Sequence, residues 1–114
     1  MAEIKTVNLE AGYPVVDAAI KRLTYELHTA RHLGYTAVKL IHGYGSSGPG
    51  GRIRVEARAY LSRLLGKRQL RAVLTGEQFS IFDEATRSAF ALCGELRKDS
   101  DLDRHNNGVT FAVL

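Results

Sequence analysis

The residues best suited to chemistry lie in and around one glycine-rich segment, residues 43–51. Five of its nine residues are glycine, and two are serines that supply hydroxyl groups. Glycine tolerates positive φ and lets another backbone approach closely. His42 precedes the segment, and Arg52 and Arg54 follow it. Where such a segment opens a helix, free N–H groups and the positive end of the helix dipole favour the binding of an anion.

A phosphate group is the anion that we expect this segment to hold. Backbone amides would bind it, and hydroxyl and guanidinium groups would add donors. Arg58 follows Arg54 by four residues, so the two share one face of a helix. Tyr44 is a candidate to stack on a base or ribose, with packing in the core as the alternative. The predicted binding residues are His42, Gly43, Tyr44, Gly45, Ser46, Ser47, Arg52, Arg54 and Arg58.

His42 ends an apolar run and faces the segment, which makes it a candidate phosphate contact or proton donor. The alternative is a structural histidine that binds the loop backbone. Residues 43–48 also fit G-x-G-x-x-G, but residues 49–51 should delay the helix, and the chain is short for a dinucleotide-binding domain. Residues 99–103 resemble the start of a calcium loop, but Arg104 occupies the glycine position. We expect no metal site.

The positioning elements follow from hydrophobic periodicity. Alternating or continuous apolar runs predict strands at 4–9, 36–41, 69–74 and 109–114. Helical spacing predicts helices at 15–33 and 52–65, and a shorter one that begins at Ser80 or Asp83 and ends near residue 91. The order β-α-β-α-β-(α)-β predicts an α/β fold, a two-layer sandwich with a mixed four-stranded sheet.

Composition limits the class of protein. The 114 residues fit one domain, carry a net charge of +4 and include one cysteine, so no disulfide forms within the chain. Residues 52–71 hold seven basic residues against one acidic residue, Glu56. This concentration is typical of nucleic-acid binders, although a solvated helix face is the alternative. With no apolar run long enough for a membrane span and no secretory signal, we expect a cytoplasmic location and no membrane partner.

Residues 38–45, VKLIHGYG, are followed by a glycine-rich stretch and a helix that opens with Ile53 and Arg54. Together with the closing residues 107–114, NGVTFAVL, they resemble the Smr (small MutS-related) domain family. The resemblance spans most of residues 4–75 and 107–114. It implies a two-layer α/β sandwich with a mixed four-stranded sheet, similar to the C-terminal domain of translation initiation factor three. Family activities include nicking DNA, cleaving RNA and acting at ribosomes.

One departure bears on catalysis. The first strand in the family usually ends in Asp-Leu-His-Gly, whose acid and imidazole are linked to cleavage. Asn8 and Glu10 stand at the Asp and His positions here. Asparagine cannot act as a general base, whereas glutamate can if its pKa is suitable. The resemblance therefore implies nucleic-acid binding more directly than catalysis, with Glu10 and His42 as the candidate catalytic residues.

Three hypotheses follow for function. The first is a DNA- or RNA-binding domain that requires no cofactor, with endonuclease activity as an open extension and, if the domain cleaves, use of a divalent metal also open. The second is a non-catalytic module that docks on the ribosome or on a larger repair protein. The third is a nucleotide-binding protein that uses the same segment. Binding that weakens steeply with added salt would distinguish the first hypothesis, because released counterions drive association with a polyanion.

Overall fold

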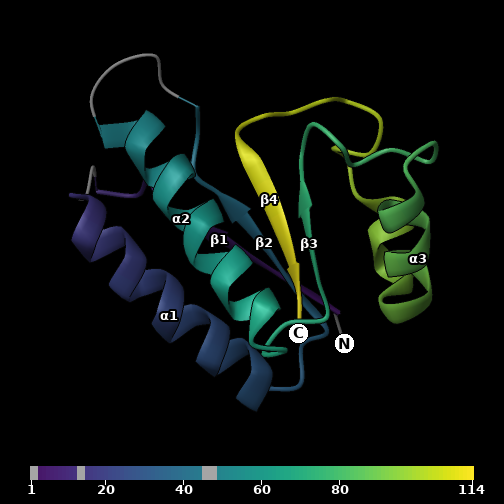
Figure 1. The fold of residues 1–114 in the computed structure, drawn as a ribbon, viewed down its shortest axis with the longest axis horizontal. Coiled ribbons are helices and arrows are strands. Elements are labelled where there is room, and N and C mark those ends of the chain that lie inside the picture. Colours follow the sequence, from purple (N-terminus) through teal and green to yellow (C-terminus); the bar gives the residue numbers. More distant parts are fainter. Residues whose placement is uncertain (1–2, 13–14, 45–48) are drawn as a thin grey trace.

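The structure, a computed structural model, describes residues 3–12, 15–44 and 49–114. Its elements run in the predicted order (Figure 1). The strands are β1 Ile4–Asn8, β2 Ala37–Ile41, β3 Ala72–Thr75 and β4 Val109–Val113. The helices are α1 Val16–His32, α2 Pro49–Gly66 and α3 Glu84–Leu92, followed by the 3₁₀ helix η1 Gly94–Lys98. No helix in the described part of the chain is long and apolar enough to cross a membrane.

The four strands form one mixed sheet in the order β1-β2-β4-β3. β1 and β2 are parallel, in a register that pairs Ile4 with Ala37. β4 lies antiparallel to both of its neighbours, β2 and β3. The carboxyl ends of β1, β2 and β3 therefore meet the start of β4 at one end of the sheet, which places residues 8–10, 42–44, 76–77 and 108–110 together.

Both faces of the sheet are covered. α1 and α2 pack on one face, where the pleat points Val38 and Leu40 of β2 toward Leu23 and Leu61 of the helices. The sheet and these two helices are the two layers of the predicted sandwich, and the cover on the other face is additional. On the other face, α3 and η1 cover a second apolar cluster (Figure 1), which is built around Phe111. Residues 76–106 thus complete the core, and the thiol of Cys93 is buried in this cluster.

Two boundaries differ from the predictions by three residues, and the other strand and helix ends named with a single position differ by at most one. α2 begins at Pro49 rather than residue 52, because proline is favoured at the first position of a helix, where its missing N–H costs no hydrogen bond. The inference that residues 49–51 delay this helix was wrong. β3 begins at Ala72 rather than residue 69. The preceding residues close α2 instead, as the Gln69 N–H donates to the Leu64 carbonyl at 2.9 Å. The predicted cap of α3 is confirmed, since the Asp83 carboxylate accepts from the Thr86 N–H at 2.9 Å.

The aspartates of the calcium-like stretch serve the second face of the sheet. Lys39 of β2 points toward this face and is 8% exposed. Its Nζ lies 2.9 Å from an oxygen of Asp99 and 2.7 Å from an oxygen of Asp101. A buried ammonium needs such partners, because an unpaired charge in the interior is costly. These carboxylates therefore neutralise a lysine and fix residues 99–101 against the sheet.

Candidate functional site

His42 is the structural centre of the end of the sheet where the predicted site lies. It follows β2, and its side chain is fully buried. Nδ1 lies 2.7 Å from the carbonyl oxygen of Gly43. Because a carbonyl can only accept, Nδ1 carries the proton, and Nε2 accepts from the Thr110 hydroxyl at 2.7 Å. Both ring nitrogens are thus engaged within the protein, as expected for the structural alternative.

Burial is the main cause that lowers the pKa of His42 from 6.5 to about 4. The positive charges of Arg58 and Arg54 lower this pKa further, whereas the hydrogen bond to the Gly43 carbonyl opposes the shift. The imidazole is therefore neutral at physiological pH, in the tautomer that the Gly43 carbonyl requires. A neutral, enclosed imidazole holds the loop backbone rather than exchanging a proton with a ligand.

A chain of hydrogen bonds extends from His42 to the surface. The Thr110 hydroxyl, which donates to His42, accepts from Nε of Arg58 at 2.9 Å. The guanidinium group of Arg58 also donates to both carboxylate oxygens of Glu77, at 2.9 and 2.7 Å. These hydrogen bonds are the main cause that holds the pKa of Glu77 below its ordinary value. β4, α2 and the segment after β3 are thereby tied to the corner at Gly43.

The conformation and the surroundings of Gly43 both favour glycine at this position. Its φ is +70°, a conformation that side chains rarely adopt. A Cβ at this position would also lie 1.8 Å from Oε1 of Glu10. The Glu10 carboxyl group therefore lies directly against the Gly43 backbone. The backbone N–H of Glu10 donates to Oδ1 of Asn8 at 2.9 Å. Asn8 and Glu10, the two departures from the family motif, form the turn that leaves β1.

The structure brings only some of the predicted binding residues together. Tyr44 is 60% exposed, and Gly43, Arg54 and Arg58 lie partly exposed at the same end of the molecule. Helical spacing of 100° per residue places Arg54 and Arg58 together on one flank of the buried Ile53, and Arg52 on the opposite flank. Arg52 is exposed on that opposite flank. Gly45, Ser46 and Ser47 lie outside the described residues.

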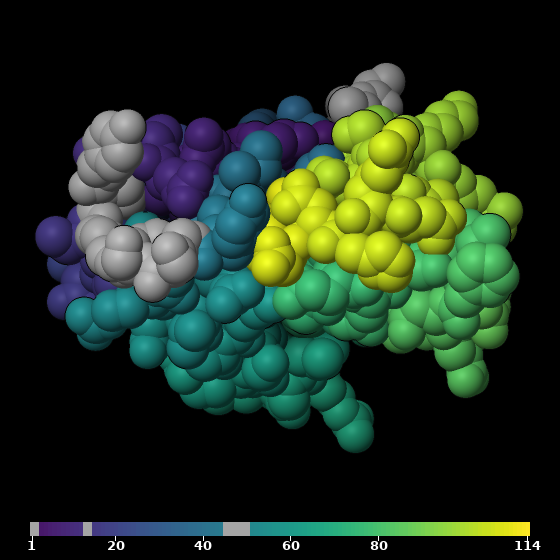
Figure 2. Space-filling model, turned by 90° about the horizontal axis from the view of Figure 1, so that it is seen from above, coloured from purple at the N-terminus to yellow at the C-terminus, as the bar shows by residue number. Residues whose placement is uncertain are grey.

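Figure 2 views the molecule onto this end and shows residues around 41–44, in blue, beside the start of β4 and the loop before it, in yellow. The N–H groups of His42 and Gly43 both donate to the Gly108 carbonyl at 3.0 Å. Sequence reasoning missed the contributions of Thr110, Glu77 and Gly108. Thr110 was the one signal in the sequence, because a threonine inside a buried strand needs a hydrogen-bond partner for its hydroxyl.

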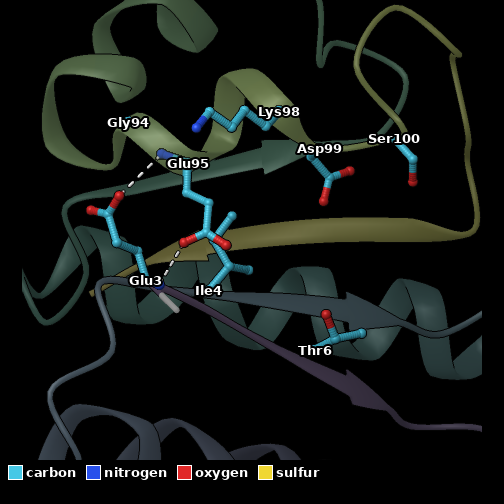
Figure 3. A pocket seen from close by; sticks show the side chains of 8 residues that line it. All are labelled: Glu3, Ile4, Thr6, Gly94, Glu95, Lys98, Asp99 and Ser100. Atoms are coloured by element: carbon cyan, nitrogen blue, oxygen red, sulfur yellow. Dashed lines mark hydrogen bonds between the residues drawn. The ribbon is translucent and has the colours of Figure 1, made fainter. Parts of the chain in front are cut away.

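A pocket of about 650 Å³ lies elsewhere, between β1 and η1 on the face away from α1 and α2. Its walls include Glu3, Glu95 and Asp99 against Lys98 (Figure 3). The Glu3 and Glu95 carboxylates each accept the other residue's backbone N–H, at 3.2 and 2.6 Å. This acidic lining does not suit a phosphate. Among the described residues, no cluster of three or more His, Cys, Asp or Glu side chains is placed to hold a metal ion.

The overall fold of the chain matches that of a solved structure. The chain is similar to the crystal structure of the Smr domain of Thermus thermophilus MutS2, with a TM-score of 0.58 and 24% sequence identity. The alignment covers 96% of each chain. No protein-family model matches the sequence, and no curated protein matches it. The predicted fold is confirmed by this likeness, and the chain is Smr-like in fold.

Proposed function

We propose that this Smr-like fold binds the phosphate backbone of DNA or RNA at the end of the sheet that carries His42. The observation that supports the proposal is the convergence of Arg54 and Arg58 on the end of the sheet that His42, Thr110 and Glu77 occupy. The pKa values of His42 and Glu77 are both lowered by Arg54 as well as Arg58, so the two guanidinium groups act on the same small region. Two cations on one flank of α2 suit a polyanion, and a phosphate would compete with Glu77 for Arg58.

Within this proposal, His42 is a positioning residue. Its imidazole fixes the Gly43 carbonyl, and through Thr110 it fixes the orientation of Arg58. A fixed guanidinium group loses less entropy when it binds a phosphate, which raises affinity without an added contact. Gly45, Ser46, Ser47 and Arg52 stay in the proposed binding surface on sequence grounds alone.

Salt-titrated binding of labelled DNA and RNA oligonucleotides tests the proposal. An Arg54→Gln variant should bind more weakly, and the slope of log affinity against log salt should fall by about one. Arg22→Gln is the matched control, because Arg22 is exposed on α1, away from the site. The proposal fails if the wild-type protein shows no salt-dependent binding, or if the two variants behave alike. Salt-independent binding of a mononucleotide would favour the nucleotide-binding alternative instead.

The sheet itself argues against a dinucleotide-binding domain. Such domains bind their ligand at the carboxyl ends of a parallel sheet. Here β4 lies between β2 and β3 and is antiparallel to both. The match of residues 43–48 to G-x-G-x-x-G thus lacks the structural context that would support it. Docking on the ribosome or on a repair protein through the same basic surface is the remaining alternative.

Strand cleavage, if the domain performs it, would depend on Glu10 rather than on His42. The Glu10 carboxyl group is partly exposed and lies against Gly43 at the proposed phosphate site. His42, by contrast, has both ring nitrogens occupied. Incubation of labelled DNA and RNA with the protein, with and without Mg²⁺ or Mn²⁺, tests whether cleavage depends on Glu10. Product that Glu10→Gln abolishes would support it, and product that persists equally in Glu10→Gln would remove Glu10 from the mechanism.

A further inference from the structure

Tyr44 presents an exposed aromatic ring at the proposed phosphate site. The side chain is 60% exposed, although it follows a strand whose residues are mostly buried. A Cβ added to Gly108 would lie 3.3 Å from Cδ1 of Tyr44. The ring therefore lies close against the backbone of Gly108, where any larger residue would crowd it. One part of the ring is supported by protein, and the rest faces solvent.

The backbone beneath this ring is fixed from several directions. The Gly108 carbonyl accepts the N–H groups of His42 and Gly43, both at 3.0 Å. The Gly108 N–H donates to Oδ1 of Asn106 at 2.9 Å. The buried His42 side chain holds the Gly43 carbonyl in addition. Tyr44 is thus presented by a rigid corner, so little ordering entropy is lost when another ring packs on it.

We propose that Tyr44 forms a base-stacking subsite and that the ligand is single-stranded nucleic acid. This inference rests on the proposed function, because Arg54 and Arg58 would hold the phosphates beside the stacked base. An aromatic ring can stack on any base, so the subsite selects unpaired bases with little regard to their identity. In a duplex the bases are already stacked on one another inside the helix, and only its ends offer a free face. Phosphate contacts alone would not distinguish the two forms.

The test compares binding of a short single-stranded oligonucleotide and of the duplex with the same sequence, at one salt concentration. The wild-type protein should favour the single strand. Tyr44→Ala should weaken single-strand binding about tenfold, the typical effect of losing one stacked base, and should change duplex binding little. Tyr44→Phe should keep the preference, because it keeps the ring. Tyr25→Ala is the matched control, since Tyr25 is 65% exposed on α1.

The outcomes separate the subsite from the proposed function. Equal wild-type affinity for both ligands, or a Tyr44→Ala effect no larger than that of Tyr25→Ala, would overturn the stacking subsite while leaving salt-dependent phosphate binding intact. Failure of the wild-type protein to bind either ligand would overturn the proposed function itself. Urea unfolding of each variant confirms that a loss of binding reflects the missing ring, because an exposed side chain contributes little to the core.

Discussion

Acidification should weaken the fold through one side chain, His42. In the unfolded chain its pKa is near 6.5, and in the folded protein burial lowers it to about 4. Between these values the unfolded state binds a proton that the folded state does not. Stability is therefore complete above the unfolded pKa and falls as pH is lowered toward the folded pKa. The difference between these two pKa values corresponds to about 3 kcal/mol in total. About 2 kcal/mol of this is lost between about pH 7.5 and about pH 5.

Urea unfolding of the wild-type protein and of His42→Gln across that pH range measures the effect. The variant is expected to be less stable at neutral pH, because it disrupts the hydrogen bonds to Gly43 and Thr110, but its stability should depend less on pH. The lowered pKa of Glu77 produces its own loss of stability only at lower pH, as that carboxylate protonates. The reasoning is refuted if both proteins lose the same free energy of unfolding, or if NMR titration places the pKa of His42 near 6.5.

Three further predictions concern the residues around His42. Thr110→Val should lower the free energy of unfolding by about 1–3 kcal/mol in urea titrations, because it leaves buried polar groups without a partner; a stable Thr110→Val protein would contradict the chain of hydrogen bonds. Glu77→Gln should strengthen binding of oligonucleotides, because the bidentate carboxylate competes with phosphate for Arg58; unchanged affinity in a folded variant would rule out this competition. Gly43→Ala should lower the free energy of unfolding by more than about 1 kcal/mol, because its φ is +70° and Glu10 blocks a Cβ; adding Glu10→Ala should restore only part of this loss, and full recovery would mean that the backbone carries no strain.

Local patterns predicted much of the fold. Apolar alternation and helical spacing identified four strands and three helices, and Asp83 was one of the two residues proposed from their type to begin α3. The start of β3 differed from the prediction because of a contact that follows no periodic pattern. The segment before β3 completes the end of α2, and no periodicity in residues 69–71 reveals that pairing. The sequence also did not reveal that α3 and η1 cover the second face of the sheet. Residues 76–106 contribute isolated apolar side chains to this face rather than a long amphipathic helix.

Only part of the candidate site could be predicted from the sequence, because some of its residues are far apart in the chain. The glycine-rich segment, His42 and Arg54 stand close in the sequence, so composition pointed to them directly. Thr110 and Glu77 reach the same place only through the strand order β1-β2-β4-β3. Sequence spacing alone also grouped Arg52 with Arg54, although two residues on a helix differ by about 200° in direction. The sequence left open whether His42 contacts a ligand or supports the loop backbone, and it did not reveal that the side chain is buried, because that burial depends on these distant partners.

The most direct test of the account maps the backbone amide shifts of the protein in an NMR titration with a short single-stranded oligonucleotide. The account predicts the largest changes at residues 42–44, 54–58 and 108–110, all at one end of the sheet. It also predicts that these changes diminish as salt is added, because binding releases counterions. Changes confined to the acidic pocket between β1 and η1, or to the outer face of α1, would contradict it.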